Sequence, residues 1–317
     1  MSQLAHPINP ATFRVLILTN PKAGARSGAP AVESLEKYLN QRDMQVEVTS
    51  DIQQLSELSA QYHENGELRA VLAAGGDGTI ALVANHTPPT APLGILPLGT
   101  ENLLSKYLNI EPTPEAVGET VLNGGIIPLD AGKANGRIFL LMVGCGFDAE
   151  VVRRLHESRT GHIHHLSYAK PIFESIRNYE YPELHITYEN GDVKGEIHAK
   201  WAFVVNLPRY AAGLKIAPNA TGFDGLLDIC TFKEGSLWDG IRYLGGVLLG
   251  QHESFQDFIT VKANRIRIDS DGQAPFQLDG DPGGYLPIEI EVLPSRLHLL
   301  APRLWLESQG VELSDDC

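Results

Sequence analysis

The chain contains 317 residues, of which 43% are hydrophobic and 20% are charged, a composition typical of a globular protein that can bury a sizeable core. Its formal net charge of −14 argues against nucleic-acid binding, because nucleic-acid-binding proteins normally present a basic face. The three cysteines, Cys145, Cys230 and Cys317, are isolated from one another in sequence, which argues against a disulfide framework or a zinc ribbon and favours a reducing compartment.

The first residues, MSQLAHPINPATF, contain no apolar stretch of the kind found in secretory signal peptides. The most apolar segments, IFLLMVGCGF and YLGGVLLG, are well short of the about 20 residues that a helix needs to span a bilayer. We therefore expect a cytoplasmic protein without a transmembrane segment, which can still act peripherally at the inner face of a membrane.

Short apolar runs alternate with helical patterns from residue 14 to about residue 123. The runs RVLILTN, QVEVT, AVLAA and LGIL are typical of buried strands. Between these strands lie two segments whose apolar residues recur at helical spacing, and we expect a further helix over 79–85. The spaced residues are Val32, Leu35 and Leu39 in the first segment, and Ile52, Leu55, Leu58 and Tyr62 in the second. This alternation predicts a doubly wound parallel sheet with helices on both faces.

Three polar or glycine-rich segments each follow one of these strands: TNPKAG at 19–24, AAGGDGT at 73–79 and LPLGTEN at 96–102. In a parallel sheet, ligands bind beyond the carboxyl ends of the strands. We therefore expect all three loops to meet at one edge, where their backbone N–H groups and hydroxyls can hold a phosphate chain.

The aspartate in GGDGT needs an explanation, because a carboxylate in a phosphate-binding turn should repel the phosphate. One interpretation is structural, with Asp77 capping the next helix. The other places a divalent cation between Asp77 and the phosphates, since Mg²⁺ commonly takes one or two carboxylates together with phosphate oxygens. The two companion loops favour the second interpretation, a nucleotide bound with Mg²⁺.

The dinucleotide pattern G-x-G-x-x-A occurs twice, as GDGTIA from Gly76 and GCGFDA from Gly144. A dinucleotide fingerprint is expected after the first strand, with an acid about 20 residues further on at the end of the next strand. Here the first match follows the third strand, and the acid at that distance, Glu101, opens a helix. The pattern G-x-x-x-x-G-K-[ST] is absent. The sequence thus disfavours a dinucleotide site and a P-loop.

After about Pro128 the apolar residues alternate with polar ones, as at Ile288, Ile290 and Val292. Such alternation is typical of antiparallel strands with one solvated face, and predicts a sandwich or barrel. In this second half of the chain, apolar residues recur at helical spacing mainly around residues 165–178 and 236–249. The sequence therefore predicts two domains, the first α/β and the second mostly β, followed by an acidic tail after about Glu307.

At this point the chain resembles the diacylglycerol kinase catalytic family, which includes bacterial lipid kinases and sphingosine and ceramide kinases. The segments that carry the resemblance are NPKAG at 20–24, GGDGT at 75–79, PLGTEN at 97–102, KIAPNATGFDGLLDI at 215–229 and LDGD at 278–281, together with GCGFDAEVV from Gly144. GGDGT alone would also admit NAD kinases, whereas the ordered set is much more specific.

The resemblance implies a Rossmann-like ATP-binding domain over 11–128, completed by 296–308, and an antiparallel β-sandwich lipid-binding domain over 129–295. It implies ATP as phosphate donor, Mg²⁺ as cofactor and a lipid acceptor at a membrane surface. Asp281 would be the general base that takes the proton of the lipid hydroxyl. Thr221, Asp224 and Leu226 would form a structural Mg²⁺ site, linked through water to Asp77. The implied ATP contacts are Asn20, Pro21, Lys22, Ala23, Gly24, Thr49, Gly75, Gly76, Asp77, Gly78, Thr79, Thr100 and Asn102.

The chain departs from the family pattern at two positions. The base is usually Glu, and Asp281 is one methylene shorter, so it must lie closer to the hydroxyl to accept its proton. Many members carry Asp after the Asn of the third loop, where this chain has Leu103. These departures leave open a non-catalytic nucleotide-binding regulator, and the shared GGDGT leaves open an NAD kinase. The identity of the lipid acceptor and the oligomeric state are not encoded in any of these motifs.

Residues 151–180 are basic and rich in histidine in an otherwise acidic chain. Arg153 and Arg154 could face anionic lipid headgroups, or could lie on an ordinary solvated helix face. His162, His164 and His165 lie close together, but no cysteine or carboxylate pair flanks them at zinc spacing, which favours an exposed loop over a metal site.

Overall fold

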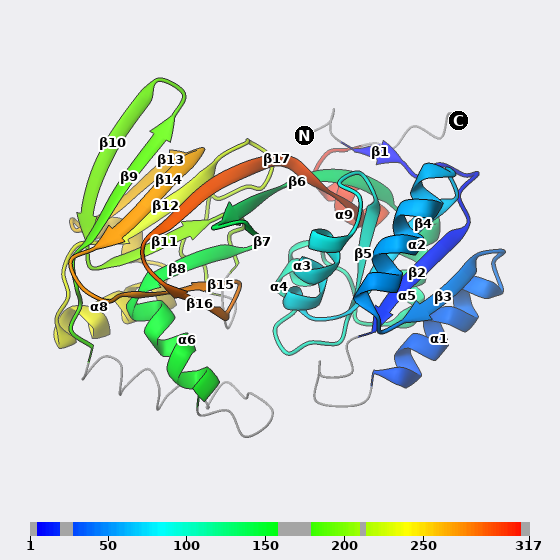
Figure 1. The fold of residues 1–317 in the computed structure, drawn as a ribbon, viewed down its shortest axis with the longest axis horizontal. Helices are drawn as coiled ribbons and strands as arrows, with labels where there is room; N and C mark the ends of the chain where they lie inside the picture. The colour runs from blue at the N-terminus through cyan, green and yellow to red at the C-terminus, as the bar shows by residue number, and fades with distance from the viewer. Residues whose placement is uncertain (1–4, 20–27, 158–178, 210–213, 312–317) are drawn as a thin grey trace. The chain divides into compact units, whose positions relative to one another are not determined.

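A computed structural model describes residues 5–19, 28–157, 179–209 and 214–311 (Figure 1). The chain divides into two compact units, one of residues 1–129 and 295–317 and the other of residues 130–294. The segments NPKAG at 20–24 and 165–178, and the histidines at 162, 164 and 165, lie outside the described residues. No helix in the described part of the chain has the length and apolarity needed to cross a bilayer.

The first unit is built on a parallel sheet in the order β17-β5-β4-β2-β3. The two central strands, β4 and β5, are buried at every position, as expected for strands covered on both faces. These strands are β2 (Arg14–Thr19), β3 (Gln45–Thr49), β4 (Leu68–Gly75), β5 (Pro92–Pro97) and β17 (Ile288–Ala301). A short strand β1 (His6–Pro7) pairs with β6 (Gly125–Ala134).

Helices connect the parallel strands, and the expected helical faces are the buried ones. Val32, Leu35 and Leu39 point inward from α1, and Leu55 and Tyr62 point inward from α2. Helix α1 packs against α5, and α2 packs against α3. The helices are α1 (Ala29–Asn40), α2 (Ile52–Glu64), α3 (Asp77–His86), α4 (Leu103–Tyr107), α5 (Pro114–Asn123) and α9 (Arg303–Ser308).

The second unit contains two antiparallel sheets that enclose a hydrophobic core. One has the order β10-β9-β14-β17 and the other β13-β12-β11-β8-β15-β16. A hairpin of β6 and β7 (Arg137–Phe139) adds to this unit. The remaining strands are β8 (Met142–Gly146), β9 (Leu184–Asn190), β10 (Val193–Ala199), β11 (Trp201–Val205), β12 (Leu227–Phe232), β13 (Phe258–Ala263), β14 (Arg265–Ser270), β15 (Pro275–Leu278) and β16 (Asp281–Tyr285).

Two helices, α6 (Phe147–Glu157) and α8 (Leu237–Leu248), cover the outer face of the six-stranded sheet, and a short 3₁₀ helix η3 (His252–Ser254) follows α8 (Figure 1). Trp201 on β11 contacts both helices, since its ring lies 4.2 Å from that of Phe147 and 5.6 Å from that of Tyr243. The next residue, Ala202, points to the opposite face and into the core. An α/β unit followed by an antiparallel β unit confirms the predicted fold class.

Candidate active site

The GGDGT and PLGTEN loops lie side by side in the first unit. They follow β4 and β5, which are adjacent parallel strands with Gly75 opposite Pro97. The backbone N–H of Leu98 donates to the carbonyl of Gly75 at 3.0 Å, which continues the strand pairing into the loops. The sequence prediction that these two loops meet at the carboxyl edge of the sheet is therefore confirmed.

Two glycines allow the loops to approach each other closely. A Cβ atom on Gly99 would lie 2.6 Å from the Cα of Gly76, a distance that no real Cβ contact tolerates. Any larger residue at position 99 would therefore push the PLGTEN loop away from the GGDGT loop. The glycines at positions 76 and 99 therefore serve the packing of the two loops against each other.

Asp77 links the two loops through hydrogen bonds. Its Oδ2 accepts the backbone N–H of Leu103 at 2.8 Å, and its Oδ1 accepts that of Leu104 at 2.9 Å. These donors belong to the first turn of α4, where backbone N–H groups have no partner within the helix. Asp77 therefore does cap a helix, but the helix is α4, which follows the other loop. Its own helix α3 begins at Asp77, and the N-cap residue Gly76 has no side chain to cap it.

Burial raises the pKa of the Asp77 carboxyl, and the backbone N–H groups of Leu104 and Leu103 oppose that rise. Burial disfavours the charged form of a carboxylate, whereas a neighbouring positive charge favours it. A cation close to Asp77 would therefore stabilise its ionised form. The structural and the metal-binding interpretations of Asp77 are compatible, because a carboxylate that accepts two hydrogen bonds retains further lone pairs.

Asn102 closes the PLGTEN loop on itself. Its side-chain oxygen accepts the N–H of Gly99 at 2.9 Å, its amide donates to the carbonyl of the same glycine at 2.8 Å, and its φ of 49° lies in the left-handed region. The next side chain, Leu103, is only 5% exposed. The position where many family members carry Asp thus packs into the interior here.

The predicted threonine contacts differ in their surroundings. Thr100 is exposed, and Thr79 is buried with its hydroxyl over Gly75. The hydroxyl of Thr49 donates to Gln54 Oε1 at 2.6 Å and accepts the N–H of Asp51 at 3.0 Å. Thr100 is therefore the threonine among these whose position is most open to a ligand.

The predicted metal loop of the second unit lies between ordered anchors. Asp130 accepts the backbone N–H of Gly225 at 2.7 Å, and Asp224 Oδ1 accepts that of Leu226 at 3.1 Å. Asp224 Oδ2 lies 2.6 Å from the ammonium of Lys262, so this carboxylate already forms an ion pair with a protein cation. The buried hydroxyl of Thr221 has no hydrogen-bond partner within the described chain. Oxygen donors are what Mg²⁺ prefers, so the donor set suits this ion, although Lys262 shares the carboxylate.

The LDGD segment forms a tight hairpin between β15 and β16, in which Leu278 pairs with Asp281. The two turn residues, Asp279 and Gly280, have φ values of 51° and 91°, as a two-residue hairpin turn with positive φ at both positions requires. Asp281 is exposed, and its carboxylate makes no hydrogen bond or ion pair within the described chain. Its position is therefore open to a ligand.

Asp279, which the sequence analysis did not single out, anchors this hairpin. Its carboxylate accepts three backbone N–H groups, those of Leu140 at 2.7 Å, Leu141 at 2.8 Å and Met142 at 2.9 Å. The sequence LDGD contains two aspartates two residues apart, which could have indicated that the first of them also has a role. Only the structure separates the anchoring Asp279 from the exposed Asp281.

The second glycine pattern, GCGFDA, has a structural role. Gly144 lies on β8 of the antiparallel sheet, and a Cβ atom there would lie 2.0 Å from the carboxylate of Asp148. Gln277 donates to Asp148 Oδ2 at 3.0 Å and accepts the N–H of Gly280 at 2.7 Å. This chain of hydrogen bonds connects the start of α6 to the LDGD hairpin.

Comparisons with known proteins agree with this geometry. Residues 14–134 match the diacylglycerol kinase catalytic domain, and residues 141–301 match the YegS C-terminal NAD kinase beta sandwich-like domain. The chain is similar to a diacylglycerol kinase of Bacillus subtilis, with 32% identity over 75% of this chain and 79% of the relative. It is also similar to a diacylglycerol kinase of Mycobacterium tuberculosis, with 29% identity over 92% of this chain and 96% of the relative.

Among solved structures, the chain is similar to that of a diacylglycerol kinase candidate from Bacillus anthracis, with a TM-score of 0.72 and 25% identity. The match covers 93% of this chain and 97% of the other. The similarity therefore extends over both units. From these matches and from the clasped GGDGT and PLGTEN loops, we conclude that the chain belongs to the diacylglycerol kinase catalytic-domain family with a YegS-type C-terminal domain.

Proposed function

We propose that the protein is an ATP- and Mg²⁺-dependent lipid kinase, which transfers the γ-phosphate to a hydroxyl of diacylglycerol, a sphingoid base or a related lipid. The observation that carries the proposal is the pair of loops held together by Asp77 at the carboxyl edge of the parallel sheet. The family of the chain supports it, because relatives named diacylglycerol kinase match over most of their length.

In this proposal the nucleotide phosphates lie against the backbone of the GGDGT and PLGTEN loops, and NPKAG would supply further contacts. Gly76 is half-buried and Gly78 is exposed, and main-chain N–H groups at such glycines are good phosphate donors. Catalysis of phosphoryl transfer depends mainly on positioning and on neutralising charge. A rigid pair of loops meets the first of these needs.

Asp77 in the first unit would hold Mg²⁺, and the loop of Thr221, Asp224 and Leu226 in the second unit would hold Mg²⁺ through its own oxygen donors. An ion at Asp77 would neutralise phosphate charge and make the ionised form of this carboxylate more favourable. The orphaned hydroxyl of Thr221 and the oxygen-only donor set support this assignment. Asp281 would act as the general base, because its carboxylate is exposed and makes no hydrogen bond or ion pair within the part of the chain that the structure describes.

Contact with a membrane surface is supported by the outer face of α8. Trp238, Ile241 and Leu248 lie three and seven residues apart along this face, and Leu249 is the C-cap residue of the helix. All four are exposed, Trp238 by 76% and Leu249 by 73%. A helix with such a face can lie in a bilayer interface, where Trp is favoured. By contrast, Arg153 and Arg154 on α6 are both engaged by Glu150, at 2.8 and 2.6 Å. An apolar contact therefore fits this unit better than a basic one.

Incubation of the purified protein with labelled ATP and Mg²⁺ tests the proposed activity, with a total lipid extract and NAD as separate acceptors. We expect label in a lipid and none in NAD. Because Asp281 is exposed, Asp281→Asn should lower turnover by about 10²–10⁴-fold, as loss of a general base does, with unchanged thermal unfolding. Label in NAD would indicate an NAD kinase. Tight ATP binding without any transfer by the wild type would indicate a regulator.

Asp77→Ala should weaken ATP binding and lower the free energy of unfolding by about 2 kcal/mol, because it leaves two backbone N–H groups of α4 without an acceptor. Urea unfolding and ATP titration measure the two effects. Thr113→Ala is the control, since it removes a side-chain cap from α5, which carries none of the implied ATP contacts. If both variants bound ATP like the wild type, the role given to Asp77 would be wrong.

Replacement of Trp238 and Leu248 by Ser should reduce binding to vesicles of phosphatidylcholine and diacylglycerol by more than about tenfold, because each buried large apolar side chain contributes about 1.5–3 kcal/mol. Co-sedimentation measures the bound fraction. Leu304→Ser, which removes a single apolar side chain exposed by 79% on α9, serves as control. Equal vesicle binding by the double variant and the wild type would exclude α8 as the contact.

A further inference from the structure

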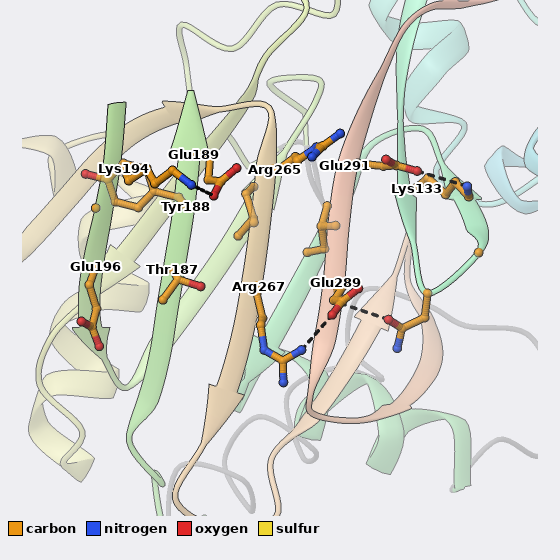
Figure 2. A pocket seen from close by; sticks show the side chains of 15 residues that line it. Lys133, Thr187, Tyr188, Glu189, Lys194, Glu196, Arg265, Arg267, Glu289 and Glu291 are labelled. Carbon is orange, nitrogen blue, oxygen red and sulfur yellow. Dashed lines mark hydrogen bonds and ion pairs between the residues drawn. The ribbon is translucent and has the colours of Figure 1, made fainter. Parts of the chain in front are cut away.

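The solvent-facing side of the sheet β10-β9-β14-β17 carries rows of charged side chains around a groove of about 910 Å³ (Figure 2). Most of these charges are paired across strands. Lys194 lies 2.5 Å from Glu189, Arg267 lies 2.8 Å from Glu289, and Lys133 lies 3.1 Å from Glu291. A charged ligand would have to displace these pairs, so the groove itself gives little reason to expect one.

At one end of β9 and β10, the cross-strand pair consists of two histidines and not of an acidic and a basic side chain. His198 on β10 is the direct cross-strand partner of His185 on β9, and the residues two and four positions away pair in the same register. The two rings are nearly perpendicular, with centroids 4.8 Å apart. Because side chains alternate along a strand, both imidazoles lie on the same face as the charged rows.

Glu183 completes a cluster of three side chains that can bind a metal. Each of these residues offers one possible ligand atom, and the three atoms lie within 4.8 Å of one another. The residues are Glu183, His185 and His198. Rigid elements hold the cluster in place. Leu184, beside Glu183, pairs with both β10 and β14, and the carbonyl of Glu183 accepts the N–H of Asp271 at 3.1 Å. Ligands on paired strands need little rearrangement to close on an ion.

Each histidine also has a carboxylate beside its Nε2. Asp271 Oδ1 lies 2.7 Å from Nε2 of His185, and Glu196 Oε1 lies 3.2 Å from Nε2 of His198. When Nε2–H donates a hydrogen bond to the carboxylate, Nδ1 keeps the lone pair that a metal requires. Histidines that bind metals almost always have such a partner, which fixes the tautomer and the ring orientation.

We propose that Glu183, His185 and His198 form a binding site for a divalent transition-metal ion of the zinc class, with Asp271 and Glu196 as positioning residues. Two imidazoles and one carboxylate suit Zn²⁺ and its neighbours, whereas Mg²⁺ and Ca²⁺ prefer oxygen ligands. The bound ion fastens the edge strand β10 to β9. The site is separate from the Mg²⁺ site of the proposed kinase and does not depend on that function.

Titration of the full-length protein with Zn²⁺ in excess Mg²⁺, followed by isothermal calorimetry, tests the proposal. We expect His185→Ala with His198→Ala to lose one bound Zn²⁺ relative to the wild type. We expect Asp271→Asn to retain that ion with about tenfold weaker affinity, as loss of an outer partner does. Zn²⁺ should raise the melting temperature of the wild type more than that of the double variant, which also shows whether that variant is folded.

His63→Ala with His86→Ala, in the first unit, is the matched control and should keep the full zinc stoichiometry. Comparison with the wild type isolates the site from any other zinc-binding residues of the chain. Equal stoichiometry and affinity for the folded double variant and the wild type would overturn the proposal, as would displacement of the ion by Mg²⁺. Loss of kinase activity in any variant would not bear on it.

Discussion

The hydrogen bonds from Leu103 and Leu104 to the carboxylate of Asp77 are the constraint on which the candidate nucleotide site depends. They hold the loop after β4 against the loop after β5, and the lack of a Cβ atom at Gly99 permits its close approach to Gly76. The carboxylate of the GGDGT loop thus first holds the two loops together. Its desolvation then makes a cation nearby favourable, which is the condition that a nucleotide with Mg²⁺ would satisfy.

The second unit uses the same device at its own candidate site. Asp279 accepts three backbone N–H groups and fixes the hairpin from which Asp281 projects. In each unit, backbone N–H groups hold an acidic side chain, and the carboxylate so fixed determines where neighbouring functional groups lie. Charge-assisted hydrogen bonds to backbone N–H groups are stronger than neutral ones, which suits them to this role.

The fold class was predictable because burial imposes simple patterns on the chain. Uninterrupted apolar runs predicted the parallel strands, such as β4, and alternation predicted the antiparallel strands, such as the first half of β17. The meeting of GGDGT and PLGTEN followed from the rule that parallel strands end at a common edge. These inferences need only local sequence and topology.

Side-chain pairings across long sequence separations were not predictable. Nothing in the sequence indicates that Asp77 caps α4, that Lys262 lies on Asp224, or that Asp279 and not Asp281 anchors its hairpin. The cluster of His185 and His198 depends on strand register in the same way, since the two residues are brought together only by the pairing of β9 with β10. Register and loop conformation are set by the whole fold, which local patterns do not specify.

Hydrogen exchange with and without ATP and Mg²⁺ tests most directly whether the two clasped loops form one phosphate-binding surface. If they do, amides of residues 75–79 and of residues 98–104 become protected together and at the same nucleotide concentration. Saturating nucleotide that protects only one loop, or neither, would contradict the account.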